Sequence, residues 1–148
     1  THIGDGRLFE QIKHQAKTSI PSNIKYNFLG HIDNSRIFSF YQQANIDVFI
    51  NVSSSEGLPV TIMEAISFGI PIIATDVGGT SEIVTNRTGI LLNPNPKIED
   101  ITNAIITSFN SKSRSREFRE DIHKYWGQHF DAKTNYQKFT HELAQINN

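Results

Sequence analysis

Cysteine is absent from the 148 residues of this chain, and its absence narrows the kinds of site that the chain can form. Without cysteine there is no disulfide scaffold, no thiolate zinc site and no cysteine nucleophile. Charge of one sign is also lacking, because 14 Lys and Arg residues are offset by 15 Asp and Glu residues and the formal net charge is −1. The chain therefore lacks the excess of positive charge that would indicate a nucleic acid as a partner.

Long apolar runs are lacking as well, since none reaches the ~20 residues that a transmembrane helix needs. No signal peptide is present, so the expected compartment is the cytoplasm. The first residue is Thr1 rather than Met, and the next residues resemble the end of a strand, which predicts a fragment of a longer protein. A hydrophobic content of 37% suits a globular protein, and we expect residues 1–148 to form one domain.

Short apolar runs alternate with helical patterns. The run at residues 46–52 is apolar except for Asp47 and Asn51, as is typical of a strand buried on both faces. The expected strands cover residues 23–29, 46–52, 71–75 and 89–92. Helices are expected around residues 8–16, 33–45 and 59–69, after Gly79, and three times beyond residue 97. This alternation predicts an α/β fold with an open parallel sheet, helices on both faces and C-terminal helices. The core is expected to include the aromatic residues Trp126, Phe130, Tyr136 and Phe139.

The segment from Glu56 to Glu64 carries the strongest chemical signal. It follows three serines and a buried strand, and Pro59 is expected to open a helix that Gly69 ends. Glu64 lies five residues beyond Pro59, about 7.5 Å along a helix that rises 1.5 Å per residue. The helix is apolar except for Thr61, Glu64 and Ser67, whose spacing predicts one narrow polar stripe.

A helix that begins at the carboxyl end of a strand can bind an anion. We expect a diphosphate here to accept hydrogen bonds from the amides of Gly57, Leu58 and Val60. The Glu64 carboxylate could then bind ribose hydroxyls, and the Glu56 carboxylate could bind sugar hydroxyls. The alternative is that both glutamates are ordinary solvated residues.

The segment and its surroundings resemble a known family, the GT4-type retaining glycosyltransferases of the GT-B fold. The hallmark is Glu-Gly-x6-Glu, followed by Ala-x3-Gly-x-Pro and Gly-Gly-x2-Glu-x-Val. The matching segments are Glu56–Glu64, Ala65–Pro71 and Gly78–Val84, with weaker matches at Gly4–Gly6, Phe28–Gly30, Tyr41–Asn45 and Gly89–Pro94. The resemblance implies the second, Rossmann-like three-layer half of a GT-B fold, with the first β-α unit missing.

The resemblance also implies functional roles. Glu56 would contact the donor sugar as the catalytic residue, Glu64 would hold the ribose, and the amides of Gly57, Leu58 and Val60 would meet the diphosphate. Ile32 would lie against the base. The implied reaction transfers a glycosyl unit from a nucleotide sugar with retention and needs no metal or other cofactor. The implied partners are the nucleotide sugar and a saccharide or lipid-linked acceptor bound by an N-terminal domain, with peripheral association of the intact enzyme at the inner face of the membrane.

Two departures from the family pattern bear on donor binding. Pro59 stands where the family commonly has Gly, and proline has no amide to donate to a phosphate. The Arg and Lys that the family supplies from the preceding β-α unit are absent, so the chain alone is expected to bind donor weakly and not to catalyse transfer.

Several alternatives stay open. Gly4-x-Gly6 could begin a dinucleotide fingerprint, but Phe9 occupies the third glycine position. Gly78 and Gly79 could lie against the donor sugar or simply form a tight turn with positive φ. The chain could also belong to another GT-B enzyme, such as an epimerase or a phosphorylase, or be a non-catalytic nucleotide-binding or interaction domain.

Overall fold

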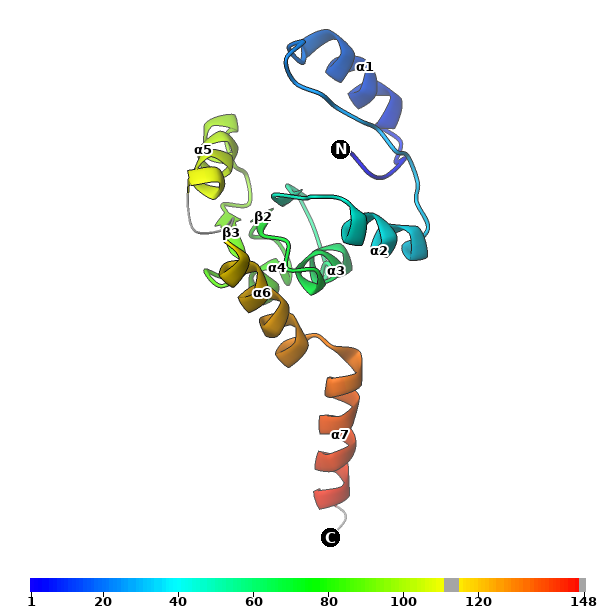
Figure 1. The fold of residues 1–148 in the computed structure, drawn as a ribbon, viewed down its shortest axis with the longest axis vertical. Coiled ribbons are helices and arrows are strands. Elements are labelled where there is room, and N and C mark those ends of the chain that lie inside the picture. The colour runs from blue at the N-terminus through cyan, green and yellow to red at the C-terminus, as the bar shows by residue number, and fades with distance from the viewer. Residues whose placement is uncertain (111–114, 147–148) are drawn as a thin grey trace. The chain divides into compact units, whose positions relative to one another are not determined.

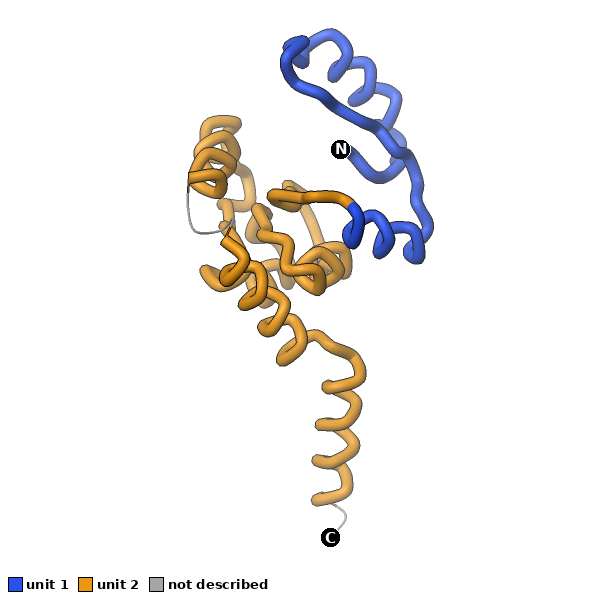
Figure 2. Tube along the Cα trace, in the orientation of Figure 1, with its two compact units in different colours: residues 1–43 blue, residues 44–148 orange. Residues whose placement is uncertain are grey.

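The computed structural model describes residues 1–110 and 115–146 of the chain (Figure 1). It forms two compact units, Thr1–Gln43 and Ala44–Asn148 (Figure 2). The single domain that the sequence predicts over residues 1–148 stays a prediction.

The first unit contains two helices, α1 (Phe9–Ser19) and α2 (Asn34–Gln43). The strand predicted at residues 23–29 is reduced to one parallel bridge between His2 and Phe28. Two backbone hydrogen bonds flank this bridge, from His2 to the Asn27 carbonyl at 2.8 Å and from Leu29 to the His2 carbonyl at 3.0 Å. The apolar face predicted for α1 buries only Ala16.

The second unit is built on a parallel sheet of three strands in the order β1 (Phe49–Asn51), β2 (Ile72–Thr75) and β3 (Gly89–Leu92). Helix α3 (Val60–Ser67) connects β1 to β2, and the short helix α4 (Thr80–Ile83) connects β2 to β3. Three helices follow: α5 (Ile98–Asn110), α6 (Arg116–His129) and α7 (Ala132–Ile146). The predicted α/β fold with a parallel sheet and C-terminal helices is confirmed.

The core of this unit lies between the sheet and its helices. Helix α3 packs against β1, β2 and α6. Its Ile62, Ala65 and Ile66 side chains have no solvent exposure, as expected for a helix that is apolar nearly all round. Ile73 of β2 packs with Leu92 and with Ala104 of α5. Burial of these branched side chains provides the main favourable free energy of this fold.

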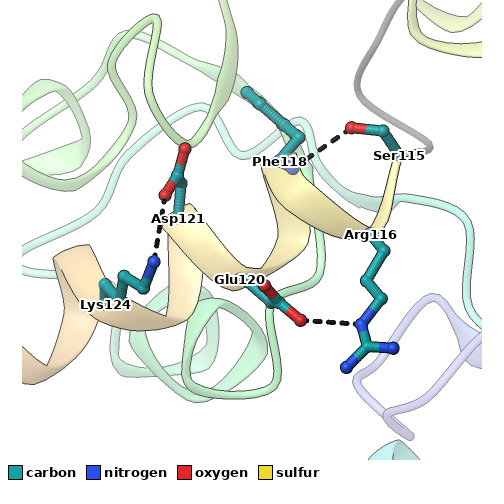
Figure 3. Close-up of polar contacts among 6 residues, drawn as sticks. All are labelled: Ser115, Arg116, Phe118, Glu120, Asp121 and Lys124. Atoms are coloured by element: carbon teal, nitrogen blue, oxygen red, sulfur yellow. Dashed lines mark hydrogen bonds and ion pairs between the residues drawn. The ribbon is translucent and has the colours of Figure 1, made fainter.

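Helix α6 is stabilised by contacts within the helix and is joined to the rest of the unit by Arg119. The Ser115 hydroxyl accepts a hydrogen bond from the Phe118 amide at 3.1 Å and so caps the helix, and Arg116 forms an ion pair with Glu120 at 2.7 Å (Figure 3). Further along, a guanidinium nitrogen of Arg119 donates to the Ile46 carbonyl at 2.6 Å, just before β1. Helix α6 also packs against α3.

The aromatic core predicted for the last two helices is only partly correct. Trp126 and Phe130 are half-buried, but Tyr136 and Phe139 are 71% and 57% exposed. No residue of α7 is buried. The amphipathic pattern predicts an apolar stripe correctly, but nothing in the described part of the chain covers that stripe. Among the same residues, no helix is both long and apolar enough to cross a bilayer.

Burial predicts losses of stability of different size for two apolar residues on neighbouring helices. We expect Ile122→Ala to lower the free energy of unfolding by about 3 kcal/mol, because Ile122 has no solvent exposure and truncation leaves a cavity. Phe139→Ala, on the exposed stripe of α7, should change it by less than about 1 kcal/mol. Urea unfolding of both variants measures the difference, and equal losses would contradict the burial described here.

Candidate functional site

The predicted site lies at the carboxyl edge of the parallel sheet. Residues 52–59 leave the end of β1 and lead into α3, and residues 76–79 leave the end of β2 and lead into α4. The register pairs Asn51 with Ala74, so both loops start at the same edge. Ligands of open α/β sheets bind outside the carboxyl ends of the strands, which makes this edge the place to search.

Glu56 is held by a side chain at the end of β1. The Asn51 amide nitrogen donates to Glu56 Oε1 at 3.1 Å. The Asn51 carbonyl oxygen accepts from the Ser53 amide at 3.1 Å and from the Ser53 hydroxyl at 2.6 Å. Glu56 therefore belongs to a partly buried polar network, and its contact with a donor sugar stays a prediction.

The neighbouring strand and loop hold the backbone of the same segment. The Thr75 hydroxyl at the end of β2 donates to the Ser53 carbonyl at 2.5 Å. The Gly79 amide donates to the Gly57 carbonyl at 2.7 Å. Because Thr75 is buried, the hydrogen bond between Thr75 and Ser53 is shielded from competing water. The loop that carries Glu56 is thus fixed from β2 as well as from β1.

Gly78 lies directly against this loop. Its φ is +55°, and a Cβ atom at this position would overlap the backbone carbonyl of Glu56. A Cβ atom on Gly79 would approach Leu58 Cδ1 to 3.0 Å. The positive φ expected of a tight turn is present at Gly78 but not at Gly79, whose φ is −84°, and the backbone that approaches Gly78 is that of Glu56.

The start of α3 presents several unpaired amides. Pro59 is the N-cap residue, with φ −74° and no side-chain cap, and its carbonyl accepts from the amides of Ile62 and Met63. Within the part of the chain that the structure describes, no group accepts a hydrogen bond from the Gly57, Leu58 or Val60 amide. These are the amides that the sequence assigns to a diphosphate, and they are available to an anion.

Glu64 is partly buried on α3, where its carboxylate has no hydrogen-bond partner among the described residues. Desolvation by burial raises the pKa of the Glu64 carboxyl above its ordinary value of 4.5. A desolvated carboxylate without a donor costs stability, and ligand hydroxyls would reduce that cost. Such a group is a functional-site candidate on physical grounds.

The structure brings most of the predicted residues together. Glu56, Gly57, Leu58, Val60 and Glu64 all lie on one loop and the helix that follows it. The last predicted contact, Ile32, is half-buried and belongs to the other compact unit, in the loop before α2.

Three residues of the network were not predicted. They are Asn51, Ser53 and Thr75, which supply its hydrogen bonds. The only signal for Asn51 was a polar residue inside an otherwise apolar strand.

A metal centre is not formed by the residues that the structure describes. Within residues 1–110 and 115–146, no three His, Asp or Glu side chains are grouped so that they could hold a metal ion. That the reaction needs no metal stays a prediction.

The fold and this loop are those of a domain with a ligand site at the carboxyl edge of its sheet, and a family comparison identifies the class of enzyme. Residues 2–125 match the model of the family described as glycosyl transferases group 1. The chain belongs to this family. The α/β fold of the GT-B type that the sequence predicts is also confirmed, because the solved structures that resemble this chain are GT-B glycosyltransferases.

Two curated relatives with more than 30% identity align with more than two thirds of this chain. The chain is 32% identical over 126 residues to the sulfoquinovosyl transferase SQD2 of Arabidopsis thaliana, covering 82% of this chain and 22% of the relative. It is 31% identical over 111 residues to the UDP-Gal:alpha-D-GlcNAc-diphosphoundecaprenol alpha-1,3-galactosyltransferase of Escherichia coli, covering 74% and 27%. The chain therefore spans about a quarter of the length of these relatives.

Among solved structures, the chain resembles Anabaena HepE crystallised in complex with UDP. The TM-score is 0.74 at 23% identity, and the match covers 97% of this chain and 40% of HepE. At this identity the likeness concerns the fold.

The contact at Gly78 predicts a position that tolerates no side chain. We expect Gly78→Ala to destabilise the fold by about 2 kcal/mol or more, because alanine is strained at positive φ and its Cβ would displace the Glu56 carbonyl. Gly57→Ala is the matched control, since no atom lies within 4 Å of its Cβ position and its φ is outside the positive region. Thermal unfolding of the two variants measures the contrast, and an equally stable Gly78→Ala variant would exclude the close approach.

The burial of Glu64 predicts a pH-dependent stability. Its folded pKa is raised above that of the unfolded chain, so the wild type loses stability as pH rises from 4.5 through the folded pKa. Glu64→Gln carries no charge, and we expect its melting temperature to exceed that of the wild type at pH 7, with the gap closing as pH falls below 4.5. Calorimetry across pH 4–8 measures this gap, and a gap independent of pH would show that Glu64 is not desolvated.

Proposed function

We propose that this chain is the donor-binding domain of a retaining, GT4-type glycosyltransferase that takes a glycosyl unit from a nucleotide diphosphate sugar. One observation carries the proposal: a carboxylate fixed at the end of β1 and a set of unpaired amides at the start of α3 lie on the same short loop. This arrangement offers a hydrogen-bond acceptor to sugar hydroxyls and donors to a diphosphate.

In this proposal the nucleotide sugar lies along the loop and the start of α3. The amides of Gly57, Leu58 and Val60 bind the diphosphate, and the helix dipole favours its negative charge. Glu64 accepts hydrogen bonds from the ribose hydroxyls. The backbone around Ile32 contacts the base. Glu56 accepts hydrogen bonds from the sugar and holds it for transfer as the catalytic residue.

Catalysis in this proposal is electrostatic. Charge accumulates on the diphosphate as the glycosidic bond breaks, and amides already directed at that position stabilise it without reorganisation. No step requires a metal or another cofactor.

The acceptor in this proposal is a saccharide or a lipid-linked sugar, bound by a second, N-terminal domain across the cleft of a GT-B fold. The Escherichia coli relative bears the name of an enzyme whose acceptor is a diphosphoundecaprenol-linked sugar. A lipid-linked acceptor would bring the intact enzyme to the inner, cytoplasmic face of a membrane by peripheral association. Polysaccharide biosynthesis is the setting that this acceptor class favours.

An NMR titration of the chain with UDP, GDP, ADP and NADH tests donor binding. We expect one nucleoside diphosphate to shift the backbone signals of residues 56–64 and 30–33 selectively. Glu64→Ala should weaken that binding by about tenfold, because a hydrogen bond to a charged group contributes roughly 1.5 kcal/mol or more. Shifts with NADH alone would contradict the glycosyltransferase assignment. If the chain alone shows no shifts, the same titration on the intact enzyme decides.

Product analysis of the intact enzyme separates the remaining alternatives. A transferred sugar with retained anomeric configuration supports the proposal, whereas a free epimer or a sugar phosphate indicates another GT-B enzyme. Glu56→Ala should lower the transfer rate by more than a hundredfold. Unchanged activity in this variant would favour a non-catalytic role for the segment.

A further inference from the structure

The Asn51 side chain uses both ends of its amide. Its oxygen accepts two hydrogen bonds from Ser53, and its nitrogen donates one to Glu56. The orientation of the amide is determined by its partners, because a backbone amide can only donate and a carboxylate can only accept. A flipped amide would lose the bonds to the Ser53 amide and to Glu56.

Asn51 is also a rigid point of attachment. It is the last residue of β1 and pairs with Ala74 in the parallel ladder. The Thr75 hydroxyl holds the Ser53 carbonyl from the next strand at 2.5 Å. Side chains on strands hold a ligand group more precisely than side chains on loops do. The backbone of Asn51 is therefore fixed by the sheet, and its side-chain amide is oriented by Ser53 at the start of the loop that carries Glu56.

Glu56 depends on this single attachment for its side chain. Among the described residues, Asn51 is the only group that donates a hydrogen bond to the Glu56 carboxylate. The second carboxylate oxygen has no partner there and is available to a ligand. A glutamate in a loop has three rotatable side-chain bonds, so without Asn51 its carboxylate would sample several rotamers.

We propose that Asn51 is a positioning residue for Glu56, holding one carboxylate oxygen so that the other meets the donor sugar. This inference rests on the proposed function, because it requires Glu56 to contact the sugar. Asn51 itself touches neither the sugar nor the bond that breaks. Its effect on the reaction passes entirely through Glu56.

A double-mutant cycle in the intact enzyme tests this dependence. The variants are Asn51→Ala, Glu56→Gln and their combination, and the readout is nucleoside diphosphate release from UDP-glucose, UDP-galactose and GDP-mannose with acceptor present. We expect Asn51→Ala to lower kcat/KM roughly ten- to hundredfold, as for loss of a hydrogen bond to a charged group. In the Glu56→Gln background the same substitution should lower it less than about threefold. The matched control pairs Asn51→Ala with Glu64→Ala, and those effects should multiply.

Asn51→Asp provides a second variant that keeps the shape of the side chain. Its carboxylate can still accept both hydrogen bonds from Ser53, but it places a negative charge about 3 Å from Glu56 in place of a donor. We expect this variant to lose more activity than Asn51→Ala, while its melting temperature shows that it remains folded. A residue that only fills space would show the opposite order.

The outcomes distinguish failure of the positioning role of Asn51 from failure of the proposed glycosyltransferase function. Coupling between Asn51 and Glu56 together with a larger loss in Asn51→Asp supports the inference. A loss that multiplies with Glu56→Gln, or an Asn51→Ala variant as active as the wild type, overturns it while the proposed function stands. If Glu56→Gln alone retains full activity, the proposed function fails, and the inference fails with it.

Discussion

The site depends on the contact between two loops at the carboxyl edge of the sheet. The loop after β1 carries Glu56, and the loop after β2 supports its backbone through the Gly79 amide and the close approach of Gly78. Neither loop has a conformation that is independent of the other. The backbone hydrogen bond joins the two loops, and because glycine has no side chain, the loops approach each other more closely at Gly78 than any other residue would permit.

This contact between the loops fixes two kinds of hydrogen-bonding group on one short segment. The fixed loop presents the Glu56 carboxylate before the helix and unpaired amides where the helix begins, so that an acceptor and several donors are supplied within five residues. A helix start without a side-chain cap leaves the amides free for a ligand at a modest cost in stability. The desolvated Glu64 on the same helix adds a second group whose environment disfavours the unliganded state. Both features reduce the stability of the free domain, and the donor proposed above would offset that cost, with its diphosphate at the amides and its hydroxyls at Glu64.

Much of this arrangement was predictable from the sequence, and the particular residues explain why. Pro59 and Gly69 delimit α3 because proline fits the start of a helix and glycine accepts the positive φ at its end. The apolar runs predicted β1 and β2, but burial on both faces is correct only for β2, because Ile50 of β1 is 41% exposed. The predicted strand at residues 23–29 is reduced to one bridge in the structure, since a short run pairs only where a neighbouring segment is available.

The Asn51–Glu56 bond and the approach of Gly78 to Glu56 could not be predicted, because they depend on strand register and on contacts between distant segments. The exposure of α7 was missed for a similar reason: periodicity identifies an apolar face but not what covers it.

The bond between Arg119 and the Ile46 carbonyl joins residues that are 73 positions apart in the chain. A ribosome adds about 5–20 residues per second, so roughly 4–15 s separate the synthesis of these two partners. During that interval β1 and α3 exist without the helix that closes over them, and the apolar side of α3 is open to water or to a chaperone. The loop that carries Glu56 is therefore complete in sequence well before the domain around it can reach its final packing. In a living cell, translation speed between these two codons would set how long the unfinished domain is exposed.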